Sequence, residues 1–217
     1  MVAKVPSPAQ SSLAEALADV DTDDAESDLV RRSSPDANGG TVAREAKLAR
    51  LLTEHFRMVW RALRRLGVPE HAVDDSAQEV FLIASRKLDA IEAGQERRFL
   101  YGVALRVAAN ARRALAARHE TPLGELVEET ASSAPSPETL LDRKRARALL
   151  DEALERLPDD LRTAFVLFEL EGCSGPEVAE LCAIPLGTAA SRLRRAREAF
   201  QAAVSDIGRR LRGGGDP

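Results

Sequence analysis

The sequence predicts an all-α protein built from two helical domains, and three observations support this. Aromatic residues make up only 4% of the 217 residues, β-branched residues are scarce, and the helix formers Ala, Leu, Arg and Glu are abundant. Apolar residues recur at spacings of three and four along two long stretches, as on the buried face of a helix. Two segments rich in acidic residues, Ser and Pro separate these stretches from each other and from the N-terminus.

These segments divide the chain into five expected parts. They are a disordered acidic leader at 1–42, a helical bundle at 43–118, a flexible acidic linker at 119–142, a second helical domain at 143–212 and a flexible tail at 213–217. The net charge is −4 overall but +6 over the bundle, −6 over the linker and +4 over residues 186–217. Such blocks indicate local contacts with an anionic partner, although solvated arginine-rich helices have the same composition.

The bundle is expected to contain three or four helices, and three of them can be placed along the chain. The first ends before Gly67 and Pro69, and residues 89–94 separate the second from the third. The residues expected to be buried are Leu48, Leu51, Leu52, Phe56, Val59, Leu63 and Leu66 on the first helix, Val73, Ala77, Val80, Phe81, Ala84 and Leu88 on the second, and Phe99, Leu100, Val103, Ala104, Val107, Ala108, Ala111 and Leu115 on the third. Three apolar faces of this kind predict a helical bundle.

The second domain is expected to end in a helix-turn-helix. Pro158 and Gly172 end its first two helices, and Ser174 with Glu177 predicts a capping box at the start of the third. A tight turn at 183–185 leads to a last helix that starts near Leu186. A short helix, a tight turn and a longer helix with an arginine-rich outer face are the pattern of DNA-binding proteins. The expected buried residues are Ala146, Leu149, Leu150, Ala153, Leu154, Leu157, Leu161, Ala164, Phe165, Phe168, Val178, Ala179, Leu181, Ala189, Leu193, Ala196 and Phe200.

Two sets of residues are candidates for nucleic-acid binding. The set on the last helix is Thr188, Ser191, Arg192, Arg194 and Arg195; arginine binds guanine through two hydrogen bonds or contacts phosphate. The set on the third helix of the bundle is Arg97, Arg98, Tyr101, Arg106, Asn110 and Arg113. Basic groups beside an aromatic ring and an amide suit single-stranded or melted DNA. Phe99 shares the apolar face and is expected in the core; solvated basic faces are the alternative for both sets.

A third candidate surface is acidic. Asp74, Asp75, Gln78 and Glu79 lie at helical spacing opposite an apolar face. Carboxylates repel DNA, so this surface suits a basic protein partner. A helix start with carboxylates near its positive end has the same pattern, so spacing alone leaves both interpretations open.

Several classes of function have no support in the sequence. The three His share no motif with each other or with Cys173 and Cys182, so we expect no metal site. No glycine-rich phosphate loop and no nucleophile–base arrangement occurs, so we expect neither an enzyme nor a cofactor. Two cysteines are too few for a disulfide scaffold, and no stretch approaches the roughly 20 apolar residues that a membrane span needs. We therefore expect a cytoplasmic protein without membrane insertion.

Five motifs in this order resemble bacterial RNA polymerase sigma factors of the extracytoplasmic-function (ECF) type. They are Asp-Asp-x-x-Gln-Glu-Val-Phe at 74–81, Arg-Phe-Leu-Tyr-x-Val-Ala at 98–104, Leu-Pro-x-x-x-Arg at 157–162, Gly-x-Ser-x-x-Glu-Val-Ala at 172–179 and Ile-Pro-x-Gly-Thr-x-x-Ser-Arg-Leu-x-Arg-Ala-Arg at 184–197. The resemblance covers about residues 43–205.

The resemblance implies a non-catalytic subunit that confers promoter recognition on core RNA polymerase and promotes strand opening. The bundle would be the region 2-like domain that melts and reads the −10 element, and its acidic surface would dock on the clamp of the large polymerase subunit. The second domain would be the region 4-like domain that reads the −35 element. The acidic linker would run toward the active centre, and an anti-sigma factor would hold the protein inactive.

Two other functions stay open from the sequence. One is a stand-alone helix-turn-helix regulator that binds duplex DNA as a dimer; the acidic motif at 74–81 argues against it, because such a regulator does not need that surface. The other is a degenerate sigma-like protein that binds only polymerase or an anti-sigma factor. Leu105 and Ala190, where the family usually has other residues, keep this reading open.

Overall fold

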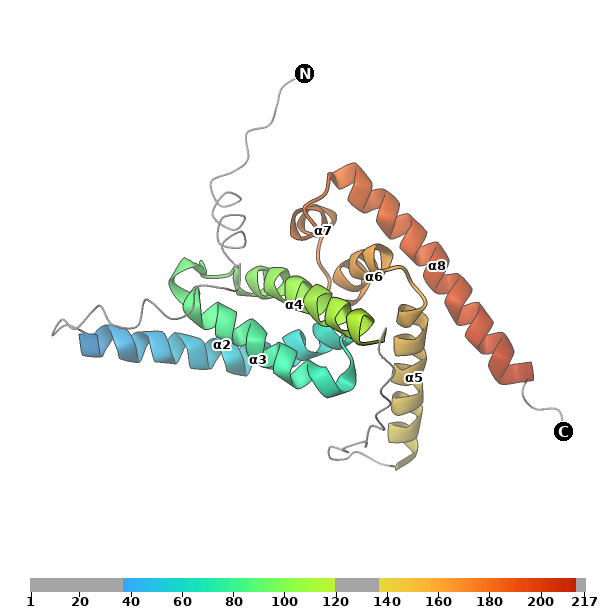
Figure 1. Cartoon of the computed structure of the whole chain (residues 1–217), viewed down its shortest axis with the longest axis horizontal. Coiled ribbons are helices and arrows are strands. Elements are labelled where there is room, and N and C mark those ends of the chain that lie inside the picture. Colours follow the sequence, from blue (N-terminus) through green and yellow to red (C-terminus); the bar gives the residue numbers. More distant parts are fainter. Residues whose placement is uncertain (1–36, 120–136, 214–217) are drawn as a thin grey trace, which may run out of the picture.

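In the computed structural model, nearly all of the described residues, 37–119 and 137–213, are helical. The helices form two groups, which Figure 1 shows side by side. The first helical group contains α2 (Ala37–Arg65), α3 (Glu70–Arg86), the short 3-10 helix η1 (Leu88–Ala90) and α4 (Glu96–His119). The second helical group contains α5 (Pro137–Glu155), α6 (Asp159–Phe165), the π-helix η2 (Val166–Leu170), α7 (Gly175–Leu181) and α8 (Leu186–Gly213).

The all-α prediction is confirmed, and no strand occurs within 37–119 or 137–213. Two helices begin earlier than the sequence analysis expected, because α2 starts at Ala37 inside the predicted leader and α5 starts at Pro137 inside the predicted linker. The other residues of the predicted leader, linker and tail (1–36, 120–136 and 214–217) lie outside the described residues. The five domain boundaries therefore stay predictions.

The first helical group is a three-helix bundle in which α2, α3 and α4 pack against one another. Gly67, with φ of +89°, ends α2 as predicted, because the N–H groups of Gly67 and Val68 turn back to the carbonyls of Arg64 and Leu63. Two residues of the predicted α2 face are not buried: Leu52 is 36% and Phe56 is 39% exposed. The predicted face is wider than the surface that α3 and α4 cover, so its edge stays open to solvent.

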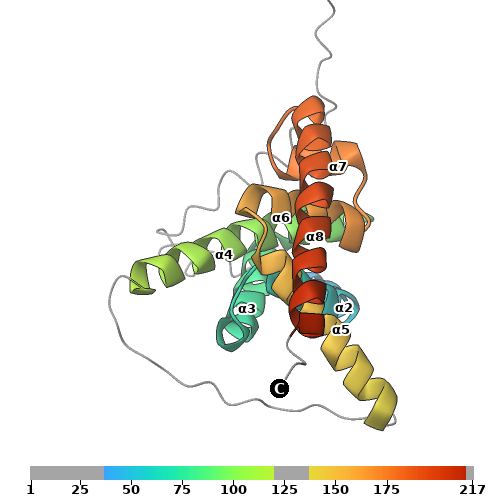
Figure 2. The same ribbon diagram turned by 90° about the vertical axis from the view of Figure 1, so that its right-hand side faces the viewer.

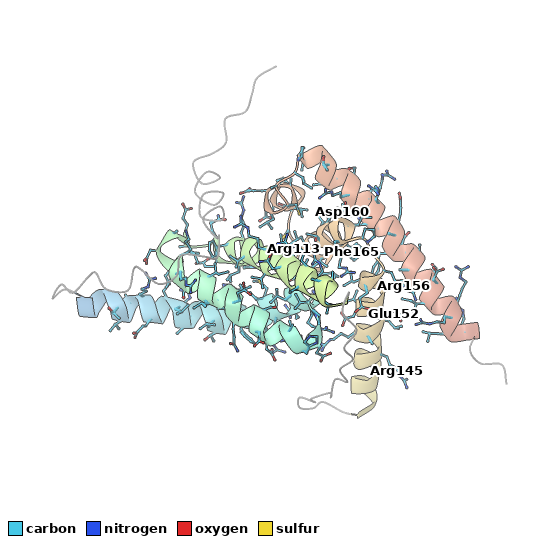
Figure 3. All side chains as sticks on the ribbon, in the orientation of Figure 1. Arg113, Arg145, Glu152, Arg156, Asp160 and Phe165 are labelled. Atoms are coloured by element: carbon cyan, nitrogen blue, oxygen red, sulfur yellow. The ribbon has the colours of Figure 1, made fainter. Side chains whose placement is uncertain are left out.

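In the second helical group, α8 packs along α5, α6 and α7. Phe165 of α6 stacks on Phe200 of α8 with ring centroids 4.5 Å apart. On α5, Glu152 accepts hydrogen bonds from Arg156 at 2.7 Å and from Arg210 of α8 at 2.8 Å; Figure 3 labels Glu152, Arg156 and Phe165. The predicted burial of Ala146 and Leu149 is wrong, because both residues of α5 are exposed.

The two groups share one continuous apolar core. It contains Leu63 and Leu66 of α2, Leu100 of α4, and Leu161 and Leu167 of the second group, all buried. Helix α4 of the first group packs against α7 of the second. In Figure 2, which looks onto the right-hand side of Figure 1, α8 lies in front of the other helices, so it forms the outer surface of the second group.

Candidate nucleic-acid interface

The helix-turn-helix begins with the predicted capping box. The N–H of Ser174 donates to Glu177 Oε2 at 2.7 Å, and the N–H of Glu177 donates to Ser174 Oγ at 3.4 Å. Both bonds satisfy amide groups that have no partner within the first turn of α7. The hydrogen bonds from the side chain and the backbone of Ser174 lower the pKa of Glu177 below its usual value. The carboxylate therefore stays charged at the N-terminus of α7, where charge stabilises the helix.

The turn between α7 and α8 contains a conformation that the sequence did not indicate. Ala183 has φ of +52°, which favours glycine, although no glycine stands there. The N–H of Ile184 reaches the carbonyl of Ala179 at 2.9 Å and the N–H of Ala183 reaches that of Glu180 at 3.0 Å, which closes the end of α7. The turn sets α8 against α7, and Ala179 of α7 and Ala189 of α8 are both buried. The tight turn is thus confirmed, with this left-handed residue in it.

The arginine-rich face of α8 points outward. Arg194 and Arg195 are exposed, and Arg194 pairs with Glu198, one turn away on the same helix, at 2.7 Å. Arg192 is half-buried, and its Nε lies 3.4 Å from Asp160 Oδ2 of α6, which Figure 3 labels. Ser191 donates to the carbonyl of Thr188 at 2.9 Å. The structure thus brings the predicted set on the last helix together on one side of α8.

The predicted set on α4 is divided. Arg106, Asn110 and Arg113 are exposed, and Arg113, which Figure 3 labels, donates to Asn110 Oδ1. Tyr101, expected on the nucleic-acid face, is only 2% exposed. Its hydroxyl donates to Glu171 Oε2 of the second group at 2.8 Å, and burial raises the pKa of Tyr101 above its usual value. In the N-terminal half of this face, Tyr101 is therefore covered and Arg98 is half-buried, whereas Arg97 and the C-terminal half are exposed.

Phe99 lies in the core, as predicted, with 1% of its surface exposed. The acidic set Asp74, Asp75, Gln78 and Glu79 lies together on the exposed face of α3. Trp60 of α2 donates its indole N–H to Asp74 Oδ1 at 2.8 Å, which holds that carboxylate in place. Leu82, one helical turn beyond Gln78, is exposed as well. The surface thus combines carboxylates with an apolar side chain, a composition that suits a protein partner.

The sequence analysis did not predict that two charged residues are buried. Arg162 donates to the carbonyls of Leu154 at 2.7 Å and Glu155 at 2.8 Å, and so satisfies carbonyl groups at the end of α5. Glu171 lies between the two groups and accepts from Arg65 Nη1 at 2.7 Å. Arg162 stands in a motif that the sequence analysis did quote. For Glu171 the sequence holds no local signal, because its partners lie about 70 and 106 residues away.

Within the part of the chain that the structure describes, no three His, Cys, Asp or Glu side chains gather where a metal ion could bind. The helices there also lack the combination of length and apolar composition that a bilayer crossing requires.

Comparisons with known proteins agree with this geometry. The family described as "Sigma-70, region 4" matches residues 147–200, which include the helix-turn-helix. The ECF RNA polymerase sigma-E factor of Escherichia coli K12 is 31% identical over 174 residues, which cover 76% of this chain and 91% of the relative. The chain belongs to the ECF family of RNA polymerase sigma factors. Sigma factors are non-catalytic subunits that give RNA polymerase its promoter recognition at transcription initiation.

A second ECF sigma factor and two solved structures are also similar to the chain. The factor SigE of Mycolicibacterium smegmatis is 28% identical over 148 residues, or 68% of this chain and 58% of the relative. CnrH, solved with the cytosolic domain of CnrY, has a TM-score of 0.55 at 20% identity and covers 91% of this chain and 97% of CnrH. RpoE, solved with the anti-sigma factor NepR of Bartonella quintana, has a TM-score of 0.54 at 24% identity and covers 71% and 94%. The two structures support the fold.

Proposed function

We propose that this ECF sigma factor reads the −35 promoter element with α8. The observation that carries the proposal is the α7–turn–α8 unit, whose outer helix presents hydroxyl and guanidinium groups on one side. The proposed contacts to duplex DNA are Thr188, Ser191, Arg192, Arg194 and Arg195. The second helix of a helix-turn-helix enters the major groove of DNA. There, Arg recognises guanine and also contacts phosphate. Four or five contacts give weak and salt-sensitive binding, so a second attachment point is needed.

The second attachment point is the polymerase itself. Asp74, Asp75, Gln78 and Glu79 form an exposed carboxylate and amide surface on α3, in a bundle that is otherwise basic. Such a surface repels DNA and attracts a basic protein surface. We assign it to the clamp of the large subunit of core RNA polymerase.

The remaining assignments complete the proposal. The bundle at 43–118 binds the melted −10 element through Arg97, Arg98, Tyr101, Arg106, Asn110 and Arg113. The linker at 119–142 connects it to the −35 domain at 143–212, with the leader at 1–42 and the tail at 213–217 outside both. The protein acts in the cytoplasm, where promoter DNA and polymerase meet. An anti-sigma factor is a further proposed partner, because the structural relatives CnrH and RpoE were solved in complexes with CnrY and the anti-sigma factor NepR.

The test is transcription in vitro with the full chain, purified core RNA polymerase and a library of promoter fragments. A transcript that starts at a defined site supports the proposal, and a chain that binds DNA without directing transcription contradicts it. Gln78→Ala should weaken polymerase binding and leave duplex binding intact; Gln201→Ala, also an exposed glutamine on a helix, is the matched control. Arg192→Ala should weaken duplex binding in a sequence-dependent way, with Arg209→Ala as its control.

A further inference from the structure

Glu171 of the second helical group contacts the N-terminal half of the α4 face. Glu171, 7% exposed, accepts from Arg65 Nη1 at 2.7 Å through Oε1 and from the Tyr101 hydroxyl at 2.8 Å through Oε2. Its backbone carbonyl accepts from Arg97 Nη2 at 3.1 Å. Glu171 therefore engages Arg97 and Tyr101, two of the groups assigned above to melted DNA.

Further ion pairs between the two groups distribute their charges in the same way. In each, the cation belongs to the first group and the anion to the second. The pairs are Arg98 with Glu180, Arg112 with Asp159 at 3.1 Å, and Arg64 with Asp151 at 3.6 Å. The net charges, +6 over 43–118 and −3 over 143–185, extend this complementarity beyond the individual pairs. The second group thus presents carboxylates to the bundle, as a nucleic acid presents phosphates.

The local fold directs Glu171 to this place. Its N–H donates to the carbonyl of Val166, five residues earlier, at 2.9 Å, which is the step of the π-helix η2. A π-helical turn is wider than an α-helical turn, so it changes the direction in which the following residue points. Such turns are rare and are frequently found at functional sites. Gly172, with φ of +72°, then ends the element immediately after Glu171.

The contact between the two helical groups is incompletely packed and incompletely hydrogen-bonded, and both features favour reversible opening. A cavity of about 330 Å³ lies there, lined by Arg64, Gly67, Asp151 and Arg162 among others. Two buried atoms, Arg98 Nε and Glu180 Oε1, have no hydrogen-bond partner in the described part of the chain. Both features weaken an interface, because protein interiors are normally filled and their polar groups paired.

We propose that Glu171 and Glu180 form an acidic latch, which holds the free chain closed by engaging Arg65 of α2 and Arg97, Arg98 and Tyr101 of α4 in place of DNA. DNA must displace the acidic latch before the bundle can bind a melted strand. The inference rests on the proposed function, which assigns Arg97, Arg98 and Tyr101 to that strand. The measured affinity for single-stranded DNA is then the affinity of the open form reduced by the open fraction.

The test compares two double variants of the full-length chain. Glu171→Gln with Glu180→Gln removes both charges of the acidic latch. Glu54→Gln with Asp206→Asn removes the same charge and frees an arginine at each site, but those carboxylates are exposed and pair with arginines of their own helices that are not assigned to DNA. Small-angle X-ray scattering reports the opening of the chain. Fluorescence anisotropy with a labelled 20-nucleotide single strand of mixed sequence reports the affinity.

We expect the first variant to show a larger radius of gyration and about tenfold tighter binding to the oligonucleotide than wild type, a change equivalent to about 1.4 kcal/mol. The control should differ from wild type by less than about twofold. Equal behaviour of the two variants would overturn the proposal. An opened chain without tighter binding would overturn it as well, because the latch would then not compete with DNA.

Arg65→Gln tests the acidic latch from the first helical group, without changing any residue assigned to DNA. It should also open the chain and tighten oligonucleotide binding, and circular dichroism would verify that the helices remain. Failure of the proposed function would be visible separately, as a wild-type chain that does not bind core RNA polymerase. A polymerase-binding chain whose variants all stay closed would contradict the acidic latch alone.

Discussion

The two nucleic-acid faces of this ECF sigma factor differ in what covers them. On α8, Arg194 and Arg195 are open to solvent. On α4, Tyr101 is buried and Arg97 and Arg98 are engaged by residues of the second helical group. Both faces have the same composition, basic residues at helical spacing, so the difference comes from the packing of the two groups. A basic helix face therefore shows where nucleic acid can bind, whereas the tertiary structure decides whether the site is free.

The largest effect on the free energy of unfolding should come from removing a side chain that packs beneath α8, the helix with the open face. Phe165→Ala removes a buried ring that stacks on Phe200 of α8, and a buried Phe→Ala substitution costs about 3–5 kcal/mol. Phe168→Ala, at a half-buried site, should cost clearly less. Urea unfolding followed by circular dichroism measures both. Similar losses at the two sites would show that α8 does not depend on this stacking.

Substitutions at two glycines test how closely the second helical group packs against the end of α2. Gly67 and Gly94 both have positive φ, so alanine should cost about 1–2 kcal/mol at either site. At Gly67 the new Cβ would also collide with Arg162 Nη1, whereas nothing lies within 4 Å at Gly94. Because Arg162 is buried and held by its carbonyl partners, it cannot easily move away.

We therefore expect Gly67→Ala to lower the free energy of unfolding by about 1–3 kcal/mol more than Gly94→Ala, the usual range for overpacking. Thermal and urea unfolding of both variants would measure the difference. Equal losses would mean that α2 and the second helical group are not in contact in solution.

A smaller effect on the free energy of unfolding is expected from the capping box at the start of the helix-turn-helix. Ser174→Ala removes both side-chain bonds of the capping hydroxyl and should cost about 1 kcal/mol. Since the folded state lowers the pKa of Glu177, its charged form stabilises the fold above the carboxyl's unfolded pKa. That contribution is lost as the pH falls through the lower folded pKa. The difference between wild type and Ser174→Ala should therefore shrink in acid; a constant difference from pH 7 to pH 3 would contradict this.

The smallest effect is a difference in reactivity between two thiols. Burial raises the pKa of Cys173 to about 11 and also raises the pKa of Cys182. Both should react slowly with iodoacetamide at pH 8 and faster as the pH approaches 11, because the thiolate is the nucleophile. Cys173 lies near Arg97 on the covered side, and Cys182 near Arg192 on the open side.

Opening the acidic latch by Glu171→Gln should therefore speed the alkylation of Cys173 and leave Cys182 unchanged. Mass spectrometry of timed samples distinguishes the two sites. Equal acceleration at both would indicate loosening of the whole second helical group instead of opening at the covered face.

Local patterns were enough to predict most of the fold. Helix periodicity, the stop at Gly67 and the capping box at Ser174 involve residues within a few positions of one another, so their physics can be read along the chain. The same holds for the acidic surface at 74–79, which one helix presents by itself. Predictions were wrong at Leu52 and Phe56, because periodicity shows which side of a helix is apolar and not how much of that side a neighbour covers.

The sequence by itself determined the helices, their order and the charges that each surface carries, because these depend on neighbouring residues. Only the tertiary structure decided that Glu171 meets Arg65 and Tyr101, across about 106 and 70 residues of chain. A pair so distant forms only when the two helical groups pack, and nothing local to either partner records it. The state of the α4 face, open or covered, is therefore a property of the packing.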